Sequence, residues 1–245
     1  MFYPVNALTL DAYDQGFLLE DFFAEKQIGL TTSRDHLAID FNADALGNKL
    51  RRFVATERTD DLIRKEFYGS KKARNGLLVG DTSSWSLSNA RKNLIKSDWE
   101  GAIKPIDYRP FDTRAVCYTP LLLERPREET IPQLFYPDNV ALSFNRKIDE
   151  VRPFTDSFVF KNAIQLHSLS LKESNYFAPL YLYPDEQDLD QARRVNFDAK
   201  LWKKTPVQGQ TPHPRYTGRS ADIRLYLRRS ALPRLSRYLC RILEN

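Results

Sequence analysis

The sequence has few of the residues on which disulfides, metal sites and membrane spans depend. Two cysteines, Cys117 and Cys240, lie far apart in 245 residues, which indicates a reducing compartment and no disulfide framework. The three histidines are scattered without metal-ligand spacing. No apolar run approaches the roughly eighteen residues of a membrane span, and the acidic N-terminal segment lacks the apolar core of a signal peptide. We therefore expect a cytoplasmic protein with neither metal nor other cofactor.

Residue patterns typical of catalysis are also missing. No serine stands in a G-x-S-x-G turn, so the sequence offers no constellation for a free-standing hydrolase. Cys117 lies between Val116 and Tyr118 in an expected strand, a place where a thiol is more often buried filling than a nucleophile. The acidic pair Asp60-Asp61 is typical of a helix start. These patterns predict a binding protein and not an enzyme.

The charge is distributed unevenly along the chain. The formal net charge is +5, with 37 Lys and Arg against 32 Asp and Glu. From Val207 onward there are eight arginines but only two acids, so the basic excess lies in this tail. The residues before it are nearly neutral. Net charge therefore gives no support for nucleic-acid binding by the folded part, although a local basic patch remains compatible with it.

The pattern of apolar residues, prolines and capping residues predicts an α+β fold, with a helical first third and a β-rich middle. Asn42, Thr59 and Ser86 are the expected N-caps. Prolines punctuate the middle, so its strands should be short, edge-like or bulged. The expected helices cover 16–25, 43–54, 60–68 and 87–95, and the expected strands cover 28–30, 36–41, 103–108, 113–119, 140–145, 158–160 and 176–183, with one more short element over 193–202.

Arginines, aromatics and prolines are concentrated in three segments of the middle of the chain, in strand-like contexts. The segments are 108–114 (YRPFDTR), 124–127 (ERPR) and 176–184 (YFAPLYLYP). Guanidinium groups suit phosphates and guanine edges, and aromatic rings stack on bases. The aromatic stripe over 176–183 has apolar residues on both faces, however, which is more typical of a strand covered on two sides than of a stacking platform.

The same segments resemble the C-terminal specificity, or target-recognition, region of type ISP restriction–modification enzymes and related N6-adenine DNA methyltransferases. Further blocks resemble that family in the same order over about residues 28 to 204. They include 29–35 (GLTTSRD) with 39–41 (IDF), 81–91 (DTSSWSLSNAR), 139–146 (NVALSFNR) and 194–198 (RVNFD). The resemblance implies a module that recognises double-stranded DNA.

Full-length enzymes of this family carry helicase, nuclease and methyltransferase parts upstream of the region. This sequence has no Asn-Pro-Pro-Tyr motif, no Gly-rich S-adenosylmethionine loop and no Walker A sequence. The resemblance therefore implies a stand-alone or truncated recognition domain without catalytic machinery. A separate methyltransferase or helicase–nuclease polypeptide would be its partner. The alternative is a non-functional remnant or a protein-interaction fragment, which the nearly neutral folded part and the missing catalytic region favour.

Polar and basic residues in the expected loops are the candidate DNA contacts. They are Thr31, Thr32, Ser33, Arg34, Lys71, Lys72, Arg74, Arg109, Arg114, Arg125, Arg127, Arg146, Lys147, Gln165 and His167. Arg125 and Arg127 flank a proline in an expected exposed loop and are the favoured pair. For Arg114 an ion pair with Asp112 or Asp107 is equally plausible. The 31–34 turn has an ordinary hairpin as its alternative, and the lysine clusters have a solvated loop as theirs.

The C-terminal segment divides from the rest at about residue 205. We expect a domain over 1–205, followed by a linker and a basic, poorly packed tail over 206–245. When 222–245 is back-translated and the first base is dropped, synonymous codons allow IFDYIYGVLHSPAYRDTYAEFLK. That string resembles the closing segment of the family's region. The sequence therefore predicts a frameshift between about residues 205 and 223, and the flanking genomic DNA would test it.

Overall fold

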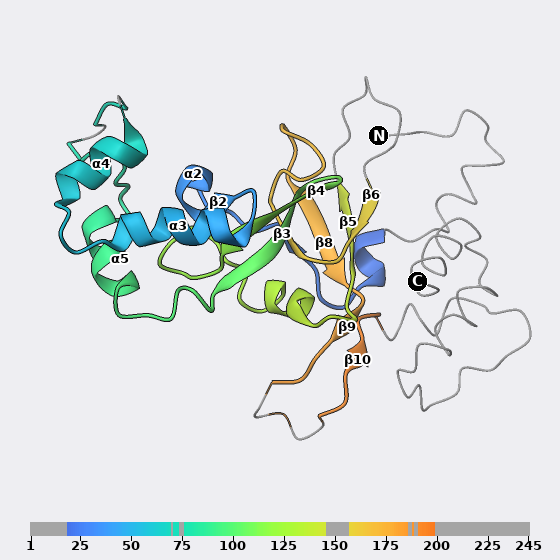
Figure 1. Cartoon of the computed structure of the whole chain (residues 1–245). Helices are drawn as coiled ribbons and strands as arrows, with labels where there is room; N and C mark the ends of the chain where they lie inside the picture. Colours follow the sequence, from blue (N-terminus) through green and yellow to red (C-terminus); the bar gives the residue numbers. More distant parts are fainter. Residues whose placement is uncertain are drawn as a thin grey trace, which may run out of the picture. The chain divides into compact units, whose positions relative to one another are not determined.

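The computed structural model describes residues 19–69, 71–73, 76–145, 157–185, 188 and 191–198. The chain forms two compact units, and each is described here by itself. The larger unit is Gln27–Phe177, and the smaller unit combines Met1–Lys26 with Ala178–Asn245. Helices and several small sheets occur together, which confirms the α+β fold (Figure 1). The predicted frameshift and basic tail lie outside the described residues.

Three capped helices dominate the first part of the larger unit. They are α3 (Ala43–Val54), α4 (Asp60–Tyr68) and α5 (Leu87–Leu94). Asn42 Oδ1 accepts from the Ala45 amide at 2.8 Å, which confirms the predicted cap of α3. Thr59 caps α4 by accepting from the Leu62 amide. Ser86 occupies the predicted N-cap position of α5, but its side chain makes no capping hydrogen bond.

The N-terminus of α5 is held by a carboxylate from a preceding loop. Asp81 Oδ1 accepts from the Leu87 amide at 3.0 Å and also binds Arg64 of α4. A carboxylate near the first turn of a helix is favoured by the helix dipole as well as by the hydrogen bond. The predicted start of the helix is therefore correct, but the group that stabilises it comes from a residue further away in the sequence.

The segment predicted as a strand over 36–41 is a strand only at its end. Residues Asp35–Ala38 form the short helix α2, and Ile39–Asp40 form β2. The helical turn buries Leu37 and Ala38. The short apolar run Leu37, Ala38 and Ile39 suits a strand, but a single turn of helix buries its first two residues equally well. The pattern alone does not distinguish the two.

A four-stranded sheet lies beside α3. Its order is β2, β4 (Asp112–Cys117), β3 (Ile103–Arg109) and β7 (Ala163–Ile164). β3 and β4 form an antiparallel hairpin with a register shift between Asp107 and Arg109, whereas β7 runs parallel to β3. The parallel pairing brings a distant segment to the edge of this hairpin. β7 itself was not predicted from the sequence.

A second sheet has the order β1 (Gln27–Ile28), β8 (Asn175–Pro179), β5 (Ala141–Asn145) and β6 (Ser157–Phe160). Gly29, directly after β1, is required by a close approach of backbones, because a Cβ there would lie 2.7 Å from the Gln165 carbonyl group. The short 3-10 helix η2 (Ile131–Phe135) precedes β5 and was not predicted.

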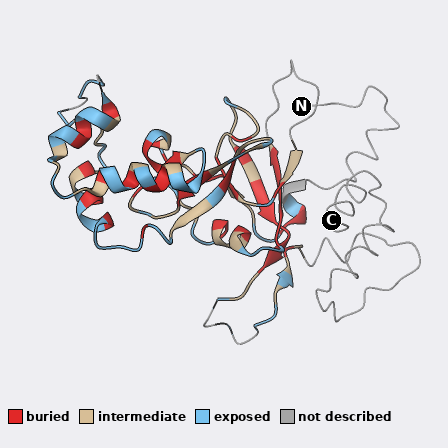
Figure 2. Ribbon diagram, in the orientation of Figure 1, coloured by how far each residue is buried: buried red, intermediate tan, exposed pale blue. Residues whose placement is uncertain are grey.

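The apolar core of the larger unit fills the space between its sheets and helices. Leu46, Leu50 and Phe53 line the inner face of α3, as their helical spacing predicts, and Ile106 and Val116 come from the hairpin. Figure 2 shows the buried residues concentrated on the strands and on one side of each helix. Cys117 is buried, and burial raises the pKa of its thiol to about 12, so it is filling and not a nucleophile.

The smaller unit contains the 3-10 helix η1 (Leu19–Phe22), β9 (Tyr181–Leu182) and β10 (Arg194–Val195). Asn196 is buried and ties the segments together by donating to the carbonyls of Glu25 and Pro179. The predicted strand over 176–183 is interrupted at Leu180, where β8 ends and β9 follows. Its apolar residues are mostly buried, which confirms that the aromatic stripe is core.

Candidate nucleic-acid interface

Backbone pairing brings three of the predicted loops side by side. Leu30 exchanges hydrogen bonds with Ile164 and Leu166, at 2.8 and 2.9 Å. The next residue, Thr31, does the same with Arg125, at 3.1 and 3.0 Å. The turn over 31–34, the Arg-Pro-Arg loop and the 165–167 segment are therefore neighbours, although they are far apart in the sequence. We call this group the loop cluster.

Arg125 and Arg127 leave the cluster on one short loop. Arg125 is exposed, and Arg127 is half-buried with its Nε and Nη2 atoms out of contact with solvent. Neither of these two atoms has a hydrogen-bond partner within the part of the chain that the structure describes. Burial lowers the pKa of Arg127, and the charge of Arg125 lowers it further. The charges of these two arginines thus repel each other, and neither forms an ion pair with a carboxylate among the described residues.

Arg109 reaches the same cluster from the end of β3. Its Nη1 donates to Gln165 Oε1 at 3.1 Å and to the Tyr108 carbonyl, and its guanidinium lies 4.2 Å from the Tyr108 ring centre. Gln165 Oε1 also accepts from the His167 amide at 2.6 Å. The structure therefore brings these three predicted contacts together. Gln165 is buried and orients the other two, whereas His167 is half-buried.

The turn over 31–34 uses most of its polar groups internally. Thr32 is buried and donates its hydroxyl to Asp35, while the same hydroxyl accepts from the Arg34 amide at 3.1 Å. Arg34 is buried as well, pairs with Glu124 at 3.0 Å and lies 4.1 Å from the Trp85 ring centre. Thr32 and Arg34 therefore stabilise the loop cluster from inside. Only Ser33 is exposed, and Thr31 is half-buried.

Arg114 follows the alternative that the sequence left open. It forms a bidentate pair with Asp112, with Nε and Nη2 at 2.8 to 3.0 Å from the carboxylate. Its guanidinium also lies 4.2 Å from the Tyr108 ring centre and 4.8 Å from that of Phe41. The carboxylate partner offsets the charge, so Arg114 presents less free positive charge than Arg125 or Arg127.

The predicted basic clusters are only partly described. Lys71 and Lys72 are exposed after the end of α4, and Lys71 Nζ lies 5.6 Å from the ring centre of Tyr68. That ring also contacts His36 of α2 edge-on. Lys71 therefore lies near α2, the helix that follows the 31–34 turn. Arg74, Arg146 and Lys147 lie outside the described residues.

Backbone strain is concentrated in the loops that carry predicted contacts. Among the described residues, the three non-glycine residues with positive φ are Ser33 at 56°, Phe111 at 64° and Arg127 at 60°. L-residues adopt this conformation at a cost of about 1–2 kcal/mol each. Strained residues of this kind persist where the surrounding structure holds them, and they cluster at functional sites.

Sequence patterns did not indicate the role of Tyr108. Its hydroxyl donates to Asp35 Oδ2 at 2.9 Å, and its ring contacts the guanidinium groups of Arg109 and Arg114. It thereby connects the hairpin to the 31–35 turn. The only signal in the sequence is an aromatic residue directly before an arginine in a strand, which is too common a pair to predict this arrangement.

Within the described residues, no cluster of His, Cys, Asp and Glu has the arrangement of a metal site. A search of the same residues for a helix with the length and apolar character of a membrane span finds none.

Comparison with known proteins shows which solved structures share this fold. The fold is similar to part of a DNA complex of DrdV, with a TM-score of 0.50 and 20% identity over 75% of this chain and 17% of that one. It is also similar to part of the ATP-dependent Type ISP restriction-modification enzyme LlaBIII bound to DNA, with a TM-score of 0.52 and 14% identity. That match covers 78% of this chain and 12% of LlaBIII. The chain thus spans less than a fifth of either protein.

No curated protein sequence matches the chain. Its residues 21–223 match the family described as the Type ISP C-terminal specificity domain, and this match extends over most of the sequence. The order of the blocks around the loop cluster, the α+β fold and this match agree with one another. The chain belongs to the family of type ISP C-terminal specificity domains.

Proposed function

We propose that this chain is a DNA target-recognition module, and that the loop cluster is its contact with double-stranded DNA. The observation that carries the proposal is the pair Arg125 and Arg127, two adjacent guanidinium groups without a carboxylate partner in the described residues. A buried donor without a hydrogen bond destabilises a fold. Phosphate oxygens or a guanine edge would pair with the exposed guanidinium of Arg125 in the bidentate geometry that arginine favours, and they would reach the buried donors of Arg127 once this side chain turns outward on binding.

Neighbouring groups extend the same surface. Arg109 donates to the side-chain amide oxygen of Gln165 and to the Tyr108 carbonyl, and these neutral partners leave its positive charge in place. Ser33 offers an exposed hydroxyl in the 31–34 turn of the loop cluster. Hydroxyl and guanidinium groups that project from several loops are the usual contacts to phosphates. Both similar structures, of DrdV and LlaBIII, are complexes with DNA, which supports the same partner for this chain.

In this proposal the chain itself performs no chemistry. It carries none of the methyltransferase or ATP-binding motifs that the family's longer enzymes have upstream. Methylation or cleavage would be supplied by a separate polypeptide with which the module assembles. The module would then act as a non-covalent binder that needs no cofactor.

The test is the binding of the full chain to short mixed-sequence duplexes, followed by fluorescence anisotropy over a range of salt concentrations. We expect Arg125→Ala combined with Arg127→Ala to weaken binding by about 1–3 kcal/mol for each arginine that contacts guanine. The slope of log K against log salt should also fall by about 0.9 for each phosphate contact removed.

Arg51→Ala combined with Arg52→Ala is the matched control. Both arginines are exposed on α3 and pair with surface glutamates, so this variant removes the same charge elsewhere on the larger unit. The basic tail is present in all proteins and cancels from the comparison. The proposal is overturned if the wild-type chain binds no duplex at low salt, or if the two double variants weaken binding equally.

A further inference from the structure

The tip of the β3–β4 hairpin carries an unusual residue. Arg109 pairs with Asp112, which leaves Pro110 and Phe111 as a two-residue turn. Proline at the first position and a positive φ at the second form the pattern of a type II turn, which ordinarily has glycine at the second position. Here that position is Phe111, with φ at 64° and 97% of its surface exposed.

Two unfavourable features thus coincide at Phe111. Its backbone adopts a conformation that L-residues disfavour, and its ring remains in water, where a large aromatic gains nothing from burial. Phe41 and Leu171 are exposed to 73% and 76%, but neither has a positive φ. A glycine at position 111 would remove both costs. The fold itself therefore gives no reason for a phenylalanine here.

The surroundings of Phe111 point to a nucleic acid as its partner. The ring of Phe158 lies edge-on to it, with ring centres 6.2 Å apart, so a second aromatic ring stands next to the protruding one. Arg109 and Arg114 flank the turn, and both guanidinium groups lie 4.2 Å from the Tyr108 ring centre. Asp112 offsets Arg114 but not Arg109. A protruding ring beside a cation fits a base step next to a phosphate.

We propose that Phe111 acts as a wedge that inserts between two adjacent base pairs of duplex DNA. Apolar side chains of DNA-bending proteins insert in this way, partly unstack a base step and bend the duplex. Because every base has a π-face, the wedge would add affinity without selecting a particular base. The inference rests on the proposed function and adds a second kind of contact to the arginines of the loop cluster.

The first test compares Phe111→Gly with the wild-type full chain. Glycine relieves the backbone strain and removes an exposed ring, so the midpoint of thermal unfolding should rise. Binding to mixed-sequence duplexes should nevertheless weaken by about tenfold, within the range of a lost stacking contact. Leu62→Ala, on the exposed face of α4, is the control for removal of an exposed apolar side chain and should leave binding unchanged.

The second test places a reporter at the same position. Phe111→Trp adds one indole, and the wild-type chain supplies the background of the three native tryptophans. We expect the added fluorescence to be quenched by acrylamide in the free protein and to be shielded once mixed-sequence duplex is bound.

Four results would overturn the inference, and they differ in what they imply for the proposed function. Suppose that the wild-type chain binds DNA. If the added fluorescence of Phe111→Trp is still quenched by acrylamide in the complex, or if Phe111→Gly binds as tightly as wild type, then Phe111 does not insert between base pairs, whereas the proposed recognition function is unaffected. If Trp at 111 is already shielded without DNA because the chains associate, the partner of the ring is protein. If the wild-type chain binds no duplex, both proposals are wrong.

Discussion

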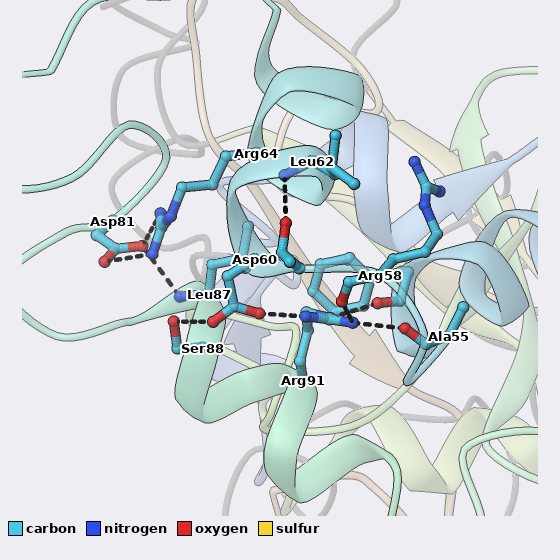
Figure 3. A network of polar contacts seen from close by, with 11 residues as sticks. Ala55, Arg58, Asp60, Leu62, Arg64, Asp81, Leu87, Ser88 and Arg91 are labelled. Carbon is cyan, nitrogen blue, oxygen red and sulfur yellow. Dashed lines mark hydrogen bonds and ion pairs between the residues drawn. The ribbon is translucent and has the colours of Figure 1, made fainter.

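The arginines of the helical region and those of the loop cluster differ in what surrounds their guanidinium groups. Arg64 and Arg91 are buried between α4 and α5, where each meets a carboxylate and backbone carbonyls (Figure 3). Arg91 Nε donates to the Phe53 carbonyl at 2.6 Å, and its Nη2 donates to those of Ala55 and Arg58. Arg125 and Arg127, in contrast, have no carboxylate partner among the described residues, and two donor atoms of Arg127 make no hydrogen bond there.

This difference distinguishes arginines that stabilise the fold from arginines whose donors are available to a binding partner. A buried cation whose donors are all satisfied is strongly destabilising to remove, because the groups that it served are left unpaired. A half-buried cation with unsatisfied donors makes the fold less stable, and its removal costs little. The composition of the sequence treats both as equivalent basic residues, and only their neighbours distinguish them.

The largest expected effect is the loss of stability on replacing Arg91 with alanine. The variant leaves three carbonyls without their donor and Asp60 without its cation. We expect the free energy of unfolding to fall by about 3 kcal/mol, as measured by urea denaturation. DNA affinity, corrected for the folded fraction, should stay at the wild-type value.

Arg91→Lys is the control for this variant. Lysine keeps the charge but cannot reach several carbonyls with a planar fork, so the stability should fall between wild type and alanine. A DNA affinity that falls with Arg91→Ala as far as with the loop variants would remove the distinction between the two groups. So would a stability loss in the Arg125 and Arg127 variants as large as that of Arg91→Ala.

A smaller effect should appear as a pH dependence of stability in the same network. The Ser88 hydroxyl donates to Asp60 and, as the largest cause, holds the pKa of that carboxyl below its usual value, with Arg91 adding to the effect. A lowered pKa in the folded state stabilises the protein above the ordinary Asp pKa. This contribution is lost as the pH falls below that value, through the folded-state pKa.

Ser88→Ala should therefore destabilise the chain by about 1 kcal/mol at neutral pH, the usual value of one hydrogen bond. The difference from wild type should shrink as Asp60 becomes protonated at acid pH. Denaturation curves at several pH values measure this directly. A difference that stays constant down to strongly acid pH would show that the hydroxyl does not act through the Asp60 carboxylate.

The sequence was sufficient for elements that depend on neighbouring residues. Asn42 and Thr59 mark the starts of α3 and α4, and the helical spacing of Leu46, Leu50 and Phe53 gives the buried face. The single helical turn of α2 was missed because a short apolar run fits a strand equally well. Ser86 was correctly predicted as the N-cap residue of α5, but the hydrogen bond to Asp81 was not predicted because Asp81 comes from a separate loop.

The site was predictable in its residue types but not in its geometry. The pairing of Leu30 and Thr31 with segments around 125 and 165 depends on contacts between residues far apart in the chain. The same holds for the burial of Arg34, whose carboxylate Glu124 lies 90 residues away. In contrast, the pair of Arg114 with Asp112 was foreseen as one alternative, because residues two apart on a strand share a face.

Arg114 stands between the two groups of arginines and provides the most sensitive test of the comparison. Like Arg91 it has a carboxylate partner, but this pair is at the surface, where ion pairs contribute little to stability. Like Arg127, it lies in one of the segments by which the sequence resembles the family, 108–114 for Arg114 and 124–127 for Arg127. Its contribution to DNA binding should therefore be limited by Asp112, and it should increase when that carboxylate is neutralised.

Asp112→Asn makes this change while keeping the shape of the side chain. We expect a stability change of about 0.5 kcal/mol or less. Binding to mixed-sequence duplexes should tighten by a few fold at low salt, because Arg114 is released and a negative charge beside the turn is removed. Asp61→Asn, on the exposed first turn of α4, removes the same charge elsewhere and is the control. Equal tightening by both variants would mean that only net charge matters. Tightening by Asp112→Asn alone would mean that the carboxylate partner decides whether an arginine in this fold is available to DNA.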